Sequence, residues 1–286
     1  MENIVLSNGV EMPQIGYGVY QVTPEECERC VSDAIGAGYR MIDTAQAYHN
    51  EEAVGRAWRK SGVSRGELFI VTKVWISNYG DGQTMRSIDE SLRKLQTDHI
   101  DLMLLHQPFC DRYGAWRDME KAYRAGKLRA IGVSNFYPDH LVDMAANMDV
   151  APMVNQVETH VFNQQREARR FMDGIGTRIM SWGPLAEGRN GLFTNPVLSR
   201  IGARHGRTVA QVALRWLLQC GVIIIPKSTH RARMEENLDV LGFSLDADDM
   251  AEIASLDEGR SLFLDHHSGD TARQFMEWRG LVEPAR

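Results

Sequence analysis

The feature that most constrains the fold is a regular alternation of short apolar segments with longer amphipathic ones along the chain. From Ile15 onward, eight apolar segments have the character of strands, and each precedes a segment whose apolar residues recur with helical spacing. The strands are expected at residues 15–19, 39–43, 68–73, 100–106, 129–134, 153–157, 179–182 and 222–226. Strands that alternate with helices pair in parallel, and eight of them close a barrel. The pattern therefore predicts an α/β fold of the (β/α)8 TIM-barrel type.

Two further elements flank the predicted barrel. Residues 4–12 form two short apolar runs around Asn8-Gly9, a pair typical of a two-residue hairpin turn. Beyond the eighth strand, acidic residues mark the start of an extra helix expected at residues 248–256, and residues 261–286 form a tail. No Pro-, Gly- or Ser-rich linker and no change of composition divides the chain. We therefore predict that residues 1–286 form a single domain.

Composition and charge exclude several classes of protein. The net charge of −6 argues against a nucleic-acid-binding surface. No apolar run approaches the ~20 residues that a membrane helix needs, and the first residues lack the basic start of a signal peptide. Cys27 and Cys30 share the apolar face of a predicted helix, so we interpret them as buried free thiols and not as a redox or metal motif. We expect a cytoplasmic monomer without nucleic-acid, membrane or metal partners.

Four ionisable residues follow or end three of the predicted strands. Asp43 and Tyr48 lie at the end of the second strand and just beyond it, Lys73 ends the third, and His106 ends the fourth. Parallel strands bring such positions to the same end of a barrel. A neighbouring lysine lowers the pKa of a tyrosine, so Lys73, held by Asp43, would make Tyr48 a proton donor. His106 would hydrogen-bond a substrate oxygen, and the set is suited to protonating a carbonyl.

Seven segments of the chain, in order, resemble the aldo-keto reductase family. They are residues 42–48, 71–75, 104–108, 132–136, 155–158, 181–185 and 225–228. The resemblance implies that Asp43, Tyr48, Lys73 and His106 form a catalytic tetrad beside NADPH. It also implies that the N-terminal hairpin plugs the bottom of the barrel and that the tail folds over the upper rim.

The same resemblance assigns the cofactor site. Ser134, Asn135 and Gln156 would bind the nicotinamide carboxamide, Trp182 would stack on its ring, and Gly183, Pro184 and Leu185 would run beside the pyrophosphate. Lys227, Ser228, Thr229 and Arg233 would bind the adenosine 2′-phosphate, and Glu236 and Asn237 the adenine. An arginine fork plus a lysine suits a phosphate dianion, and phosphate sites of such barrels follow the seventh and eighth strands. No Gly-x-Gly-x-x-Gly follows a strand, which excludes a Rossmann site.

Trp75 and Gln107 are the candidate substrate residues, since each follows the end of a predicted strand beside Lys73 or His106. Gln107 stands where many family members have Trp, and it makes the pocket more polar. Trp182 stands where family members frequently have Tyr. The face of its indole ring stacks at least as well as that of a Tyr ring. The tail around His266 and His267 is a further candidate wall. That pair predicts no metal site, because adjacent side chains point apart.

The resemblance thus implies an NADPH-dependent reductase that converts aldehydes or ketones to alcohols. Its expected partner is a small carbonyl compound: a small aldehyde, a dicarbonyl such as methylglyoxal, or a keto-sugar acid. One alternative is a cofactor-binding regulatory subunit with slow turnover, since the family includes such members. Another is a barrel enzyme of different chemistry, such as an isomerase. The sequence has neither a metal motif nor an acid pair, which argues against this alternative.

Overall fold

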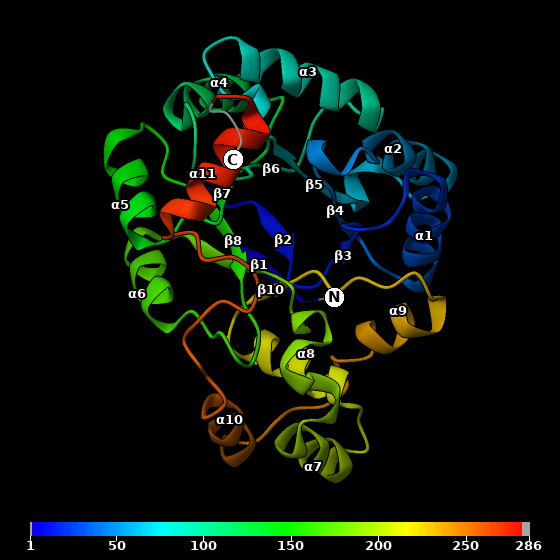
Figure 1. Cartoon of the computed structure of the whole chain (residues 1–286). Helices are drawn as coiled ribbons and strands as arrows, with labels where there is room; N and C mark the ends of the chain where they lie inside the picture. The colour runs from blue at the N-terminus through cyan, green and yellow to red at the C-terminus, as the bar shows by residue number, and fades with distance from the viewer. Residues whose placement is uncertain (1, 282–286) are drawn as a thin grey trace.

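The computed structural model describes residues 2–281. Its centre is a sheet of eight parallel strands in the order β10-β9-β8-β7-β6-β5-β4-β3 (Figure 1). The strands are β3 (Tyr17–Gly18), β4 (Met41–Asp43), β5 (Phe69–Val74), β6 (Leu102–Leu105), β7 (Ile131–Ser134), β8 (Val154–Glu158), β9 (Arg178–Trp182) and β10 (Ile223–Ile224). The sheet closes on itself, because Gly16 N donates to Ile224 O at 2.8 Å and Ile224 N donates to Gln14 O at 2.9 Å. The predicted barrel is confirmed.

Helices surround this barrel. Those that follow the strands are α1 (Pro24–Ala37), α2 (Glu51–Lys60), α3 (Gln83–Leu95), α4 (Arg112–Arg124), α5 (Pro138–Asn147), α6 (Arg166–Ile175), α8 (Val209–Gln219) and α9 (Arg231–Leu238). The additional helices are α7 (Pro196–His205), α10 (Ala247–Ala254) and α11 (Gly269–Arg279). Short 3-10 segments are η1 (Gln46–Tyr48), η2 (Arg65–Glu67), η3 (Ile76–Asn78) and η4 (Ala186–Thr194).

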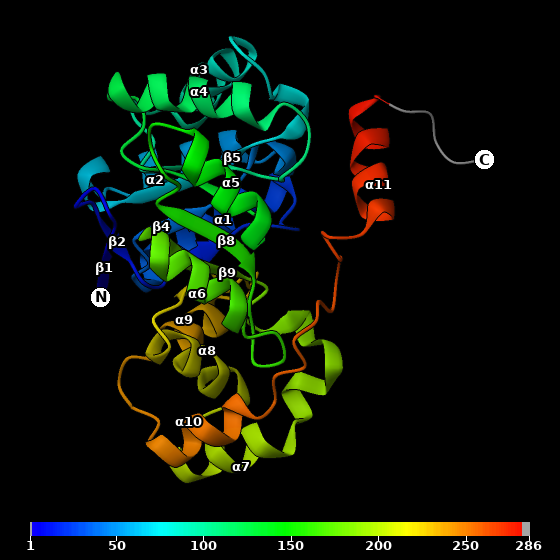
Figure 2. The same cartoon turned by 90° about the vertical axis from the view of Figure 1, so that its left-hand side faces the viewer.

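The two flanking elements lie at opposite ends of the barrel. Figure 2 shows the hairpin of β1 (Asn3–Val5) and β2 (Glu11–Pro13) at one end and α11 beyond the other. The predicted hairpin is present, with Ile4 paired with Met12. Leu6 N donates to Val10 O at 2.9 Å, so its turn has three residues and not the two that we predicted. The helix expected at residues 248–256 is α10, whereas α11 lies in the segment that we interpreted only as a tail. The last five residues of that predicted tail lie outside the described residues.

Local signals explain where the helices begin and end. Thr23 caps α1 by accepting a hydrogen bond from Glu26 N, and Gly38 ends the helix with a φ of 113°, a conformation that favours glycine. Helix α4 begins at Arg112, because Asp111 Oδ1 accepts from Gly114 N at 2.9 Å and so caps the helix. The start of this helix is therefore set by a polar cap.

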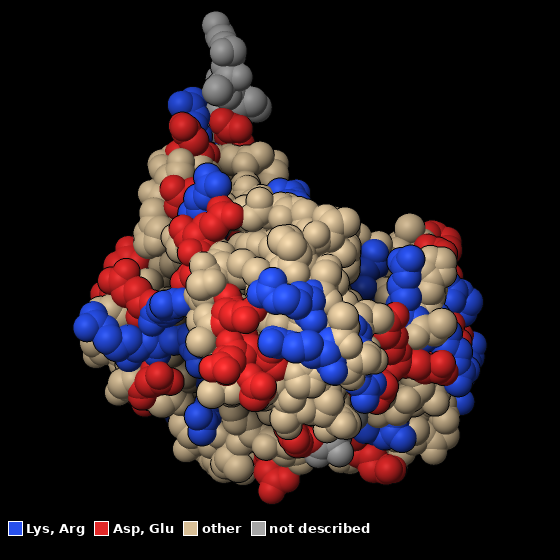
Figure 3. All heavy atoms as spheres, turned by 90° about the horizontal axis from the view of Figure 1, so that it is seen from below, with Lys and Arg blue, Asp and Glu red and all other residues tan. Residues whose placement is uncertain are grey.

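The barrel interior is apolar, and the strands are buried along nearly their whole length. Cys27 and Cys30 are buried free thiols on α1, as predicted. Lys73 is an exception among the core residues, because its side chain is charged and 0% exposed. Within residues 2–281 no helix is both long and apolar enough to cross a membrane. On the face shown in Figure 3, basic and acidic side chains are interspersed.

Candidate active site

Parallel strands place the four ionisable residues at one end of the barrel. Asp43 is the last residue of β4, Lys73 precedes the last residue of β5, and His106 directly follows β6. Tyr48 ends η1, the turn that follows β4. The register of β4, β5 and β6 puts their carboxyl ends side by side. The structure therefore brings together the four residues on which the sequence prediction rested.

Lys73 is the centre of this cluster. Its Nζ donates to Asp43 Oδ1 at 2.6 Å, to Thr44 O at 3.0 Å and to Tyr48 Oη at 3.4 Å. An ammonium has three N–H donors, so each of them has an acceptor here. The second carboxylate oxygen of Asp43 accepts from Gln156 Nε2 at 2.9 Å. These bonds fix a buried positive charge against the phenol of Tyr48.

The electrostatics of Tyr48 differ from our expectation. Burial raises the pKa of Tyr48 well above its usual value, and the Asp43 carboxylate raises it further. The pKa of Tyr48 is therefore raised on balance, so the net direction that we predicted is wrong, because burial and Asp43 dominate. Asp43 lies closer to the ammonium than Tyr48 does, so it balances most of the lysine charge. Tyr48 consequently holds its proton at neutral pH, as a proton donor must.

His106 faces the same phenol. Its ring lies edge-on to Tyr48 with 5.6 Å between the ring centroids, and 5.1 Å from the ring of Trp75. Burial lowers the pKa of His106 well below its usual value, and the charge of Lys73 adds to the effect. His106 is therefore a neutral imidazole, which has one N–H to donate.

The residues assigned to the nicotinamide continue the cluster at the ends of β7, β8 and β9. Ser134 Oγ donates to Gln156 O at 2.8 Å. Asn135, whose φ is 64°, donates from Nδ2 to His106 O at 3.1 Å and accepts from Trp182 Nε1 at 2.8 Å. Because Gln156 also binds Asp43, the tetrad and these residues form one connected network.

The residues assigned to the phosphates lie after β9 and β10. Gly183, Pro184 and Leu185 lead from β9 into η4, and Lys227, Ser228 and Thr229 follow β10. Arg233 lies in the first turn of α9, which also carries Glu236 and Asn237. Lys227 and Arg233 are exposed, and neither forms an ion pair within residues 2–281. Glu236 accepts from Thr208 Oγ1 at 2.6 Å.

The C-terminal tail forms a wall above the tetrad, as the resemblance implied. His266 Nε2 donates to Gln107 Oε1 at 3.0 Å, and the ring of Phe275 lies 6.2 Å from that of Trp75. His267 instead packs on Tyr137. We did not predict Phe275, although Ser268, which caps α11, is a helix-start signal.

A cavity of about 1080 Å³ opens beside this wall, between η1, η3 and α3. Trp75 and Trp278 border it. None of the four tetrad residues lines it, so it neighbours the candidate site without being the site itself.

Comparisons with known proteins agree with this geometry. The family model described as "Aldo/keto reductase family" matches residues 6–258. The chain belongs to the aldo/keto reductase family. It is similar to the glyoxal reductase of Bacillus subtilis, with 46% identity over 259 residues, 90% of this chain and 93% of that one. It is also similar to the methylglyoxal reductase DkgA of Salmonella typhimurium, with 41% identity over 91% of this chain and 94% of that one.

Among solved structures, a mutant of Gox0644 in complex with NADPH superimposes with a TM-score of 0.88 and 39% identity. The match covers 94% of this chain and 98% of that one. The protein is thus an aldo-keto reductase, an NADPH-dependent oxidoreductase. Within residues 2–281 no group of three or more His, Cys, Asp or Glu side chains is arranged to hold a metal ion.

Proposed function

We propose that this aldo-keto reductase converts small, polar carbonyl compounds to alcohols, with Tyr48 as the proton donor. The observation that carries the proposal is the buried cluster in which Lys73 Nζ binds both Asp43 and Tyr48. The substrates would be small aldehydes, dicarbonyls such as methylglyoxal, or keto-sugar acids. Relatives named glyoxal reductase and methylglyoxal reductase support this class.

The residues present fit NADPH. Two cations without a partner among the described residues, Lys227 and Arg233, suit the 2′-phosphate dianion, with Ser228 and Thr229 between them in the chain. Trp182 is partly exposed and offers an aromatic face for the nicotinamide, and its Nε1 donates to the amide oxygen of Asn135. When bound, NADPH supplies the hydride that reduces the carbonyl carbon.

The chain's own residues manage the charge that develops on the carbonyl oxygen. The neutral His106 would donate a hydrogen bond to that oxygen. Tyr48 would transfer its proton to it, because an alkoxide is a stronger base than a phenolate even when the pKa of the phenol is raised. The Lys73 ammonium, 3.4 Å from the phenol oxygen, would then stabilise the phenolate until it takes up a proton from solvent.

The wall of the site favours polar substrates. Gln107 Oε1 already accepts from His266 and, at 3.4 Å, from Asn135. Gln107 Nε2 has no hydrogen-bond partner within residues 2–281 and is not fully buried. This N–H pair would donate to a second oxygen of the substrate, such as that of a dicarbonyl. Trp75 would cover the apolar part of the substrate.

The test is the rate of NADPH oxidation with a panel of small aldehydes, dicarbonyls, keto acids and bulky apolar ketones. We expect the highest kcat/KM with the small oxygen-rich compounds. Tyr48→Phe, which removes only the hydroxyl, serves as the matched control for proton donation. Absence of turnover with every carbonyl would refute the proposed reaction, and preference for bulky apolar ketones would refute the substrate class. We also propose that residues 1–286 form one domain, since the family match runs from residue 6 to residue 258.

A further inference from the structure

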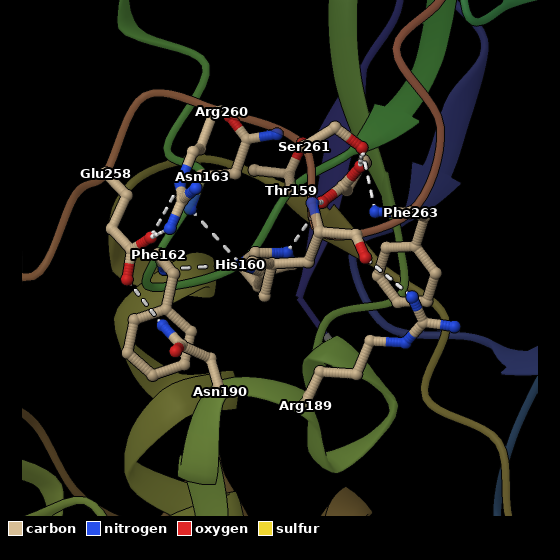
Figure 4. A network of polar contacts seen from close by, with 12 residues as sticks. Thr159, His160, Phe162, Asn163, Arg189, Asn190, Glu258, Arg260, Ser261 and Phe263 are labelled. Atoms are coloured by element: carbon tan, nitrogen blue, oxygen red, sulfur yellow. Dashed lines mark hydrogen bonds and ion pairs between the residues drawn. The ribbon is translucent and has the colours of Figure 1, made fainter. Parts of the chain in front are cut away.

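A buried carboxylate joins the barrel to the C-terminal tail. Glu158 ends β8, and its side chain is 0% exposed. Its Oε1 accepts from His160 Nε2 at 3.0 Å and from the backbone N of Leu262 at 2.8 Å. Its Oε2 accepts from the Oγ of Ser261, a residue that Figure 4 labels together with His160. The tail is thus fixed to the barrel at two consecutive residues, far from β8 in the sequence.

The neighbouring histidine fixes the geometry of this carboxylate. His160 Nδ1 accepts from Phe162 N at 3.2 Å and from Asn163 N at 3.1 Å. Since Nδ1 is an acceptor, the ring proton is on Nε2 and points at Glu158. Burial alone raises the pKa of Glu158, but the hydrogen bonds from His160, Ser261 and Leu262 lower it on balance. Glu158 is therefore a charged group whose acceptor sites are directed at the tail.

Beyond this anchor, the tail contacts residues of both proposed binding regions. The ring of Phe263 lies edge-on to Trp182 at 5.2 Å. Arg189, from the η4 loop, places its guanidinium 4.0 Å from the centroid of the Phe263 ring, and Figure 4 shows these two side chains together. Arg189 also donates to Leu262 O at 2.6 Å. A few residues further on, His266 reaches Gln107. The path of the tail from Ser261 onward therefore decides where the substrate wall stands.

We propose that Glu158 is a positioning residue for carbonyl binding: it anchors the tail at Ser261 and Leu262, so that His266 reaches Gln107. The inference rests on the carbonyl reduction proposed above. Glu158 acts through the tail and does not reach the reacting atoms. Without its carboxylate, Ser261 Oγ and Leu262 N lose their acceptor at the barrel, and the wall above the tetrad loses its support.

Three substitutions and a control test the anchor. Glu158→Ala removes all three hydrogen bonds. Ser261→Ala removes the bond from the tail side chain to Glu158, together with the bond that Ser261 Oγ accepts from Phe263 N at 3.0 Å, and leaves His160 paired. Glu158→Gln should rescue function, because its amide oxygen can replace Oε1 and its nitrogen can donate to Ser261 Oγ. Ser255→Ala is the control, since the Ser255 hydroxyl on the neighbouring α10 segment donates only to Glu252 O.

We expect Glu158→Ala to raise the KM for the carbonyl by about tenfold or more, the scale of one lost hydrogen bond to a charged group. The kcat should stay within about threefold, because binding and not proton transfer is affected. Ser261→Ala should raise KM by about threefold, and Glu158→Gln and Ser255→Ala by less than about twofold. Hydrogen–deuterium exchange should be faster at residues 261–268 in Glu158→Ala, with the barrel strands still protected.

An unchanged KM in both Glu158→Ala and Ser261→Ala, with an active parent enzyme, would overturn the inference. A loss of thermal stability and of kcat without faster exchange in the tail would likewise overturn it, in favour of a purely structural role. If Glu158→Ala does not fold, Ser261→Ala carries the test. Failure of the parent enzyme to oxidise NADPH would refute the proposed function instead, and the exchange measurement would still decide whether Glu158 anchors the tail.

Discussion

Replacing Asp43 by Asn removes the only carboxylate that contacts Lys73 among the described residues, and it keeps the side chain's size. Both side chains are essentially inaccessible to solvent, at 0% exposure for Lys73 and 2% for Asp43. Removing one partner of such a buried pair costs about 3–5 kcal/mol, because the other charge is left without compensation. An Asn amide would also turn its NH₂ toward either Lys73 or Gln156, which are both donors.

The corresponding loss of thermal stability follows from the size of the chain. One kcal/mol shifts the Tm of a domain of 150–250 residues by about 2–4 °C, so Asp43→Asn should lower Tm by about 6–20 °C. Urea unfolding at pH 7, followed by circular dichroism, measures the free energy itself. The control is Asp81→Asn, which breaks an ion pair with Arg117 at the surface, where the side chains are 57% and 47% exposed. Its Tm should barely change.

The pH dependence gives a second, independent readout. Burial already lowers the pKa of Lys73, and Asp43 opposes this. In Asp43→Asn only the effect of burial is left, so the pKa of Lys73 in the folded protein falls further, whereas the unfolded chain keeps the proton up to about pH 10. The unfolded state then binds more protons, so the free energy of unfolding rises with pH by up to about 1.4 kcal/mol per unit. The difference in free energy of unfolding between the parent protein and Asp43→Asn should therefore be smaller at pH 9 than at pH 7. A deficit below about 1 kcal/mol at pH 7, well under the cost of an unpaired buried charge, would refute this reasoning.

Three further expectations concern catalysis and binding. Tyr48→Phe should lower kcat by about 10²–10⁴-fold with NADPH affinity retained, and steady-state kinetics showing more than about a tenth of the parent kcat would exclude Tyr48 as the proton donor. Arg233→Ala should weaken NADPH binding by about tenfold or more, the effect of one charge-assisted contact, while NADH binding stays nearly constant. Equal losses of affinity for both cofactors in fluorescence titrations would show that Arg233 has a structural role instead. Gln107→Trp should shift relative kcat/KM toward apolar aromatic aldehydes with little change in NADPH affinity, and an equal effect on polar and apolar substrates would contradict a role in selectivity.

Much of the barrel could be predicted from short stretches of sequence, because strands and helices are encoded locally. Apolar periodicity marked the strands, and capping residues such as Thr23 marked helix starts. The convergence of Asp43, Lys73 and His106 also followed, because parallel strands in a barrel all end at the same rim. Once the strands were assigned, the position of each residue along its strand was enough.

Only the tertiary structure revealed the contacts of the tail and the electrostatics of the site. Glu158 meets Ser261 across 103 positions of the chain, and Gln107 meets His266 across 159. No periodic pattern encodes such pairs, since each depends on the path that the tail takes after the barrel is complete. The pKa of Tyr48 was predicted in the wrong direction for a related reason. The sequence by itself determined which groups are neighbours at the rim, but the depth of burial and the 2.6 Å contact of Asp43 with Lys73 decided which charge dominates.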